Sequence, residues 1–463
     1  MLYRSTRGAS PEIKFSEVLL SGLAPDGGLY VPDYVPSFSE QELREFEDCS
    51  YQDLASKILY PFVEDELDQV TFRRLVHSSY ESFEKNDIIK LKSLSDDVSI
   101  LELFHGPTLA FKDIAMQLLG TLLNYFAKRN NQKISVLGAT SGDTGSSAIA
   151  ACSRYENVDL FILYPNGRVT EIQRKQMTTS GSVNVHALAI ETDFDGCQDI
   201  VKALFLDEEI KNLNNKVIAA NSINWTRCMS QSVYFFWSFL KLRKLHNQIT
   251  FSIPSGNFGH AYAGWLAKKM GLPIHRLLIA TNRNDVLHKM LTENLYSKGE
   301  VYETLAPSMD ISIASNFERL LFDLFDNDPK KVTSLMSSFP DISIRLPDKQ
   351  LKAMRNFFTS YASSDAEICD QIRDTFKTNN MILDPHSATG LIASNMKREV
   401  NEYVISMATA HPAKFIHAIE QALPGRELET VEQLKGINSK KESFKVLAND
   451  LGVVKEYILN NII

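Results

Sequence analysis

The stretch KISVLGATSGDTGSSAIAA, residues 133–151, decides the fold class of this chain. It begins with the apolar run ISVLGA at 134–139, passes through a glycine-rich turn from Gly138 to Gly145, and continues into a helical pattern of small residues. The same order returns in ITFSIPSGNFGHAYAG at 249–264. A strand, a glycine turn and a helix in this order are typical of α/β proteins, in which helices separate the parallel strands.

Further strand candidates are apolar almost throughout and alternate with helical patterns such as SSAIAACSRY and HAYAGWLAKKMG. They are DLFILYP at 159–165, VNVHALAI at 183–190, KVIAAN at 216–221 and HRLLIATN at 275–282. Continuous apolar strands are typical of parallel sheets that helices cover on both faces. We therefore predict an α/β architecture.

The changes of pattern along the chain predict three parts. We expect a mostly helical N-terminal domain over residues 1–95 and a small α/β domain over 131–249. A large domain is expected from 96–130 together with 250–463. Since no long flexible linker separates these parts, we expect them to pack closely, with the functional site in a cleft between them.

Composition and charge argue against several classes of protein. The net charge of −8 disfavours a nucleic acid or an anionic membrane as partner. No segment approaches 18 uninterrupted apolar residues, and the opening MLYRSTRGASPEIKF lacks the pattern of a signal peptide, so we expect no membrane association. Five cysteines without a CxxC pair favour free thiols in the cytoplasm. No metal-binding spacing such as HExxH occurs, and we expect no metal.

Both glycine turns are candidate anion sites. The free amides and the dipole at the start of a helix attract phosphate or carboxylate. In the second turn, Ser255 and Asn257 add polar side chains beside Gly256 and Gly259. Neither turn has the spacing of a Walker A or of a dinucleotide fingerprint. For each turn alone, a tight connection without a ligand is the alternative interpretation.

The stretch FHGPTLAFKD at 104–113 places Lys112 among apolar residues, on a helix expected to start after Pro107. Burial disfavours the ammonium form, and a neutral amine can form a Schiff base with an aldehyde. A lysine beside an apolar run more often extends its amine to solvent, so its position alone leaves both interpretations open. Together with a phosphate cradle and a second anion turn, however, such a lysine matches the needs of pyridoxal phosphate and an amino-acid substrate.

The chain resembles the threonine synthase family over essentially its whole length. The motifs that carry the resemblance are GLAPDGGLYVP (22–32), FHGPTLAFKD, ATSGDTG (139–145), SGNFG (255–259), PSMDIS (307–312), SNFER (315–319), DPHSATG (384–390) and ATAHPAKF (408–415). The resemblance implies the fold type II of pyridoxal-phosphate enzymes, which is similar to tryptophan synthase β. It therefore implies two domains with parallel-type sheets flanked by helices, plus an N-terminal segment of the threonine synthase type.

By this resemblance, Lys112 holds pyridoxal phosphate and, once the substrate amine displaces it, moves protons at the substrate Cα. The cofactor phosphate is expected on Ser255, Gly256, Asn257, Phe258 and Gly259. Thr409 is expected next to the pyridine nitrogen. A hydroxyl at that place does not enforce protonation of the nitrogen.

The substrate α-carboxylate is expected on the turn formed by Thr140, Ser141, Gly142, Asp143 and Thr144. Related enzymes have asparagine at the position of Asp143, and an aspartate there is electrostatically awkward unless it is protonated or turned away. A phosphate leaving group needs a cationic pocket, for which the resemblance offers Arg227, Lys175 and Arg319. A surface or interdomain ion pair is the alternative for each of these three residues.

The family reaction converts O-phospho-L-homoserine and water to L-threonine and phosphate through an external aldimine of pyridoxal phosphate. We expect this activity, a small-molecule substrate, and a monomer or homodimer. The alternatives are a pyridoxal-phosphate-dependent phospholyase or dehydratase acting on another hydroxy or phosphorylated amino acid, a non-catalytic protein with the same fold, and a nucleotide-binding protein. His105 is expected to position the lysine helix, and His386 and His411 to organise turns.

Overall fold

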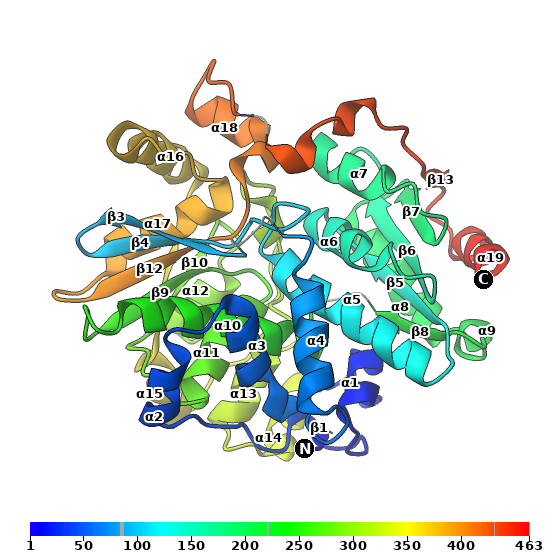
Figure 1. Cartoon of the computed structure of the whole chain (residues 1–463), viewed down its shortest axis with the longest axis horizontal. Coiled ribbons are helices and arrows are strands. Elements are labelled where there is room, and N and C mark those ends of the chain that lie inside the picture. The colour runs from blue at the N-terminus through cyan, green and yellow to red at the C-terminus, as the bar shows by residue number, and fades with distance from the viewer. Residues whose placement is uncertain (84–87, 220–221, 430, 463) are drawn as a thin grey trace.

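The computed structural model describes residues 1–83, 88–219, 222–429 and 431–462, and contains two large sheets that lie side by side (Figure 1). The six-stranded sheet has the order β11-β10-β9-β12-β4-β3. Its strands are β3 (Lys90–Ser95), β4 (Val98–Glu102), β9 (Ile249–Pro254), β10 (Leu277–Thr281), β11 (Phe358–Ala362) and β12 (Tyr403–Ala408). All neighbours in this sheet are parallel except the hairpin β3–β4.

The five-stranded sheet has the order β13-β7-β6-β5-β8, and every pair in it is parallel. Its strands are β5 (Ile134–Ala139), β6 (Val158–Pro165), β7 (Val185–Ile190), β8 (Lys216–Ala219) and β13 (Lys445–Leu447). All residues of β6 are buried, as expected for a strand that helices cover on both faces. The six predicted strands are confirmed, although the last two residues of KVIAAN lie outside the described residues.

Helices cover both sheets, and a two-stranded ribbon, β1 (Tyr3–Ser5) with β2 (Tyr30–Pro32), lies near the N-terminus. The helices before the first glycine turn are α1 (Phe15–Ser21), α2 (Glu40–Phe46), α3 (Tyr51–Leu59), α4 (Gln69–Ser79) and α5 (Lys112–Arg129). Those of the central part are α6 (Asp143–Cys152), α7 (Glu171–Thr178), α8 (Phe194–Leu206), α9 (Glu208–Lys211), α10 (Trp225–Leu242) and α11 (Gly259–Lys269). The remainder are α12 (Val286–Glu293), α13 (Phe317–Leu324), α14 (Pro329–Met336), α15 (Asp348–Arg355), α16 (Asp365–Asn379), α17 (Pro385–Lys397), α18 (Ile416–Ala422) and α19 (Leu451–Asn461).

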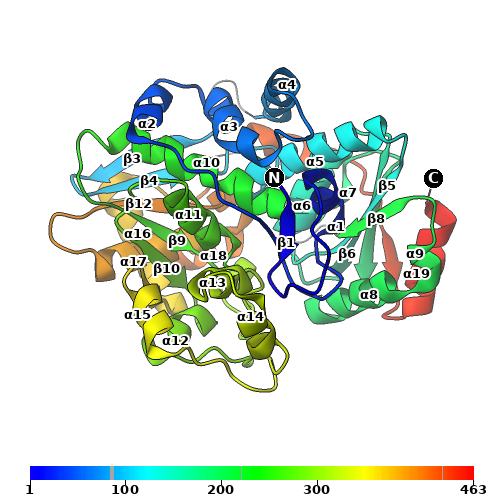
Figure 2. The same ribbon diagram turned by 90° about the horizontal axis from the view of Figure 1, so that it is seen from below.

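The N-terminal helices do not stand apart from the rest of the chain. Helix α3 packs on α10, and α4 packs on α5, so the first residues cover helices that belong to both sheets. Figure 2 shows α2, α3 and α4 along one side of the molecule, with α8, α9 and α19 gathered around the five-stranded sheet. One large apolar core includes residues of α2, α3, α4, α5 and α10, whereas α8, α9 and α19 contribute to a second apolar cluster at the five-stranded sheet. Within the described residues, no helix is both long and apolar enough to cross a membrane.

Two segments belong to sheets that differ from those expected from the predicted division into domains. Strand β3 at 90–95 joins the six-stranded sheet, because a short turn returns the chain directly into β4. Strand β13 at 445–447 pairs with β7 in the five-stranded sheet, although residues 250–463 were expected to belong to the large domain. Helix α19 follows it and buries Val454 and Ile458 against the apolar cluster around α8. Covering an apolar helix face and a sheet edge outweighs closeness in sequence.

Candidate active site

Three of the predicted site residues lie just beyond the carboxyl ends of parallel strands. Ser255 follows β9, Thr409 follows β12, and Thr140 follows β5. The loop between β4 and α5 joins them, because the Phe111 amide donates to the Thr409 carbonyl at 2.8 Å. In open α/β sheets this edge is where ligands bind, because loops from several strands converge there.

Helix α5 begins at Lys112 itself, four residues later than a start directly after Pro107. The intervening residues form a turn in which Leu109 has φ +60°, a left-handed conformation that ends regular helix. The buried Asp113 carboxylate closes this turn by accepting bonds from the Thr108 amide at 2.8 Å and the Thr108 hydroxyl at 2.6 Å. The turn places Lys112 at the first helical position, with its side chain 14% exposed.

Burial lowers the pKa of Lys112 from 10.5 to about 8. The Asp143 carboxylate, with Oδ2 at 3.8 Å from the amine, opposes this effect, whereas the positive charges of Arg227 and Lys414 add to it. About half of the amines are therefore neutral at pH 8. A neutral, enclosed amine is the form that attacks an aldehyde.

The SGNFG turn is the candidate anion cradle in front of α11. Phe258 has φ +60°, which bends the chain so that α11 begins at Gly259, while its ring packs against Phe317 in the core. A Cβ at Gly256 would come within 3.2 Å of the Met309 backbone, so the turn is closely covered. The Ser255 hydroxyl is buried without a protein partner in the described part of the chain.

These features fit the phosphate of pyridoxal phosphate. The start of α11 supplies free amides and the positive end of a helix dipole, and Ser255 supplies a donor that the protein leaves unused. The Asn257 carbonyl is engaged by the Asn316 amide at 3.0 Å, which keeps the turn in place. Lys112 directly follows the neighbouring loop, where Phe111 stacks on His260 of α11 at 4.9 Å.

The ATSGDTG turn is braced from within. The Thr140 hydroxyl accepts bonds from the amides of Gly142 and Gly145, both at 2.9 Å, so it holds the turn. Gly142 has φ +135°, and a side chain there would collide with Gln173. Ser141 is exposed, and Asp143 and Thr144 open α6.

Asp143 is turned into the protein and carries its charge there. Its Oδ1 accepts from Lys414 Nζ and from Gln173 Nε2, both at 2.8 Å. Burial alone would raise the pKa of this carboxyl, but the ammonium groups of Lys414 and Lys112 hold it well below its usual range. An aspartate at this place is therefore accommodated by a paired lysine.

Lys414 is the site residue that the sequence analysis missed. It lies in a short 3₁₀ turn, Pro412–Lys414, within the ATAHPAKF motif, and its side chain is fully buried. Its amine also donates to the Thr108 carbonyl at 2.7 Å. The sequence feature that could have identified Lys414 is the presence of a charged residue inside an apolar motif.

The three cations proposed for the substrate phosphate have different surroundings. The Arg319 guanidinium lies in the core, where it donates to the carbonyls of Tyr30 and Ile223. The Lys175 amine donates to Glu171 on α7 and to Asn438 in the C-terminal segment. Arg227 is buried, and its Nε and Nη1 have no hydrogen-bond partner among the described residues. Burial lowers the pKa of Arg227 to about 10. Of the three, Arg227 is the one that combines closeness to Lys112 with free donors.

Thr409 is held by a chain of hydrogen bonds from α17. Its amide donates to the Ser387 hydroxyl at 2.9 Å, and Ser387 in turn bonds the buried Asp384, which caps the helix. His386 bonds Asp384 through Nδ1 at 2.8 Å and accepts the Ser308 amide at 3.0 Å through Nε2. His386 therefore organises a turn, as predicted.

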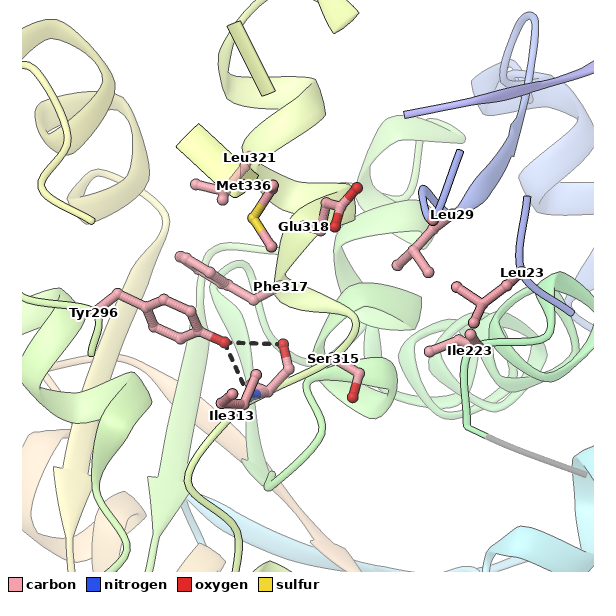
Figure 3. A pocket seen from close by; sticks show the side chains of 12 residues that line it. Leu23, Leu29, Ile223, Tyr296, Ile313, Ser315, Phe317, Glu318, Leu321 and Met336 are labelled. Atoms are coloured by element: carbon pink, nitrogen blue, oxygen red, sulfur yellow. Dashed lines mark hydrogen bonds between the residues drawn. The ribbon is translucent and has the colours of Figure 1, made fainter. Parts of the chain in front are cut away.

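A separate apolar cavity of about 230 Å³ lies between the N-terminal segment and α13 (Figure 3). Leu23 and Leu29 line one side, and Phe317 and Leu321 line the other. Tyr296 closes its floor through hydrogen bonds with the Ala314 backbone. None of the predicted site residues lines this cavity.

Comparisons with known proteins identify the family to which the chain belongs. Three family models match the chain: "Threonine synthase N terminus" over residues 2–80, "Pyridoxal-phosphate dependent enzyme" over 83–338, and "Threonine synthase, C-terminal" over 387–458. The chain is 42% identical to the threonine synthase of Pseudomonas aeruginosa, with 99% of this chain and 98% of that protein aligned.

Solved structures give the same result. The structure of PLP-bound threonine synthase from Brucella melitensis superimposes with a TM-score of 0.96 at 42% identity, covering 100% of this chain and 99% of that one. The yeast threonine synthase structure has a TM-score of 0.93 at 38% identity and covers 99% and 98%. Matches of this extent and identity place the chain among the pyridoxal-phosphate-dependent enzymes, and it belongs to the threonine synthase family.

Proposed function

We propose that the chain is a threonine synthase that converts O-phospho-L-homoserine and water to L-threonine and phosphate. The observation that carries this proposal is the pairing of an enclosed amine, Lys112, with a buried arginine, Arg227, whose Nε and Nη1 are unpartnered within the described residues. An amine of this kind serves amino-acid chemistry, and a buried cation with unpartnered donors is costly unless an anion joins it. A phosphorylated amino acid supplies that anion.

Pyridoxal phosphate, bound through Lys112, would supply the electron-withdrawing ring that makes protons on the substrate carbons acidic. Ser255 and the amides of Gly256 to Gly259 would hold its phosphate, because they form the cradle in front of α11. Thr409 would lie beside the ring nitrogen. Its amide donates to the Ser387 hydroxyl and its carbonyl accepts from the Phe111 amide, and these bonds fix its backbone.

The remaining roles follow from charge and position. The start of α6, with Ser141, Gly142 and Thr144, would bind the substrate carboxylate through backbone amides and hydroxyl groups. Arg227 would bind the substrate phosphate and stabilise the negative charge that grows as phosphate leaves. The Nζ of Lys112 would take up and return protons at Cα, a task suited to a group with a pKa of about 8.

The test is product identification with the purified, cofactor-loaded protein. Incubation with O-phospho-L-homoserine should release phosphate and L-threonine in equal amounts. Release of phosphate with 2-oxobutyrate and no threonine would instead support the phospholyase or dehydratase alternative. Reactions with O-phosphothreonine and O-phosphoserine measure that alternative directly.

We also propose a cytoplasmic protein that is a monomer or homodimer. The five cysteines are free thiols, four of them buried, which suits a reducing compartment. Light scattering coupled to size-exclusion chromatography distinguishes a monomer from a homodimer. A larger assembly would contradict this part of the proposal.

A further inference from the structure

Lys414 joins three segments that are far apart in the sequence. It ends the short turn after β12, and its fully buried amine bonds Asp143 Oδ1 at 2.8 Å and the Thr108 carbonyl at 2.7 Å. Asp143 opens α6 after a strand of the five-stranded sheet, whereas Lys414 follows a strand of the six-stranded sheet. The contact therefore ties the two sheets together beside Lys112.

Asp143 has two charged neighbours: Lys112, whose charge changes during the proposed reaction, and Lys414, whose charge does not. Lys112, 3.8 Å from Oδ2, must change its charge whenever its amine reacts or moves a proton. Gln173 donates to Oδ1 at 2.8 Å but carries no charge. If Lys112 were the one cation beside it, the buried Asp143 carboxylate would lose its charge partner each time Lys112 became neutral, at a high cost in free energy.

We propose that Lys414 is a positioning residue for the reaction proposed above: its ammonium keeps Asp143 ionised and turned with Oδ2 toward Lys112, whatever the charge of Lys112. The proposal rests on the assignment of Lys112 as the reacting amine. Because Lys414 bonds Oδ1 of Asp143, only Oδ2 is available to interact with Lys112. Lys414 thus limits how strongly Asp143 can stabilise the charged form of that amine.

A purely structural role makes a different prediction. The charged groups that act on Lys112 are Asp143 on α6, Arg227 on α10, Asp113 on α5, and Lys414. Loss of the Lys414 charge removes one repulsion and leaves Asp143 with Lys112 as its charged partner, so the amine of Lys112 should hold its proton to higher pH. A residue that only fills space and satisfies a carbonyl would leave that titration unchanged.

The experiment uses the full chain resolved from its cofactor. The initial rate at which visible absorbance appears on adding pyridoxal phosphate is measured as a function of pH, since it reports the neutral amine of Lys112. Lys414→Met should raise the midpoint by about one pH unit or more. The double variant Asp143→Asn/Lys414→Met removes both charges and should return the midpoint toward that of the wild type.

Lys268→Met is the matched control, because Lys268 also donates to a backbone carbonyl, that of Ile274 at 2.7 Å, but lies on α11 away from Asp143. It should leave the midpoint unchanged. Circular dichroism confirms that each variant is folded. If Lys414→Met does not fold, Lys414→Arg replaces it. Because Lys414→Arg keeps the charge, it should keep the wild-type midpoint. An unchanged midpoint in folded Lys414→Met, or a double variant that stays shifted, overturns the inference. Failure of the wild type to take up pyridoxal phosphate would contradict the proposed function instead.

Discussion

The amine of Lys112 lies 3.8 Å from Oδ2 of Asp143, although the two residues open different helices, α5 and α6. Helix α5 follows a strand of the six-stranded sheet, and α6 follows a strand of the five-stranded sheet. The pair therefore marks the point where the two sheets meet. Any change in the spacing of the sheets alters the electrostatic environment of Lys112.

Replacing Lys112 tests the centre of the site. In Lys112→Ala, the turnover number should fall by about 10²–10⁴ or more, because the group that moves protons is lost. The visible absorbance gained with pyridoxal phosphate should also disappear, while circular dichroism stays that of the folded wild type. Near-normal turnover in this variant would refute the assignment of Lys112.

Arg227→Met should weaken substrate binding but stabilise the cofactor-free protein. The KM for O-phospho-L-homoserine should rise by about 10- to 100-fold, because a charge-assisted contact to phosphate is lost. Removing a buried cation with unpartnered Nε and Nη1 should at the same time raise the free energy of unfolding of the cofactor-free protein. Steady-state kinetics and urea denaturation measure the two effects.

Two matched variants accompany Arg227→Met. Lys175→Met removes a cation whose partners are Glu171 and Asn438, and the KM should change little. Arg319→Met leaves the Tyr30 and Ile223 carbonyls without their donor, and should destabilise the fold by about 3 kcal/mol or more. A large rise in KM for Lys175→Met with none for Arg227→Met would contradict the assignment of the phosphate pocket.

The pH dependence of stability offers a further measurement. Because the pKa of Lys112 is lowered to about 8 in the folded protein, the unfolded chain binds more protons between pH 8 and 10.5. The Lys112 contribution therefore destabilises the cofactor-free protein fully below pH 8, and the penalty fades as the pH rises to 10.5. Lys112→Met should be the more stable protein at pH 7, by about 3 kcal/mol, with a gap that closes near pH 10.5. A gap that does not vary with pH would show that the pKa of Lys112 is not lowered.

The C-terminal helix allows a test with two neighbouring residues. Val454 is fully buried against the cluster around α8, whereas Val453 is 43% exposed. Val454→Ala should weaken docking of α19 by about 1–2 kcal/mol and speed proteolysis of the C-terminal segment. Val453→Ala should leave the cleavage rate close to that of the wild type. Equal rates in the two variants would contradict the docking seen here.

Local patterns predicted much of the fold and part of the site. The apolar runs identified the six predicted strands, since a strand buried on both faces needs an uninterrupted apolar sequence. The glycine turns were equally predictable, because Gly142 has φ +135°, which side chains rarely adopt, and a Cβ at Gly256 would come within 3.2 Å of the Met309 backbone. The start of α5 could not be predicted from local sequence, because the turn before it depends on hydrogen bonds between Thr108 and Asp113 across a loop.

The sequence by itself determined the α/β class, the two glycine turns and the lysine that precedes them, because each depends on residues that are neighbours in the chain. Only the tertiary structure decided which charges meet. It joined Lys414 to Thr108, 306 positions away, and separated Arg227, with unpartnered donors among the described residues, from Arg319, whose donors the core uses. It also carried β13 across to the five-stranded sheet. The physical reason is that the free energy of a buried charge or an uncovered sheet edge is set by its partners in space, and no local pattern records those partners.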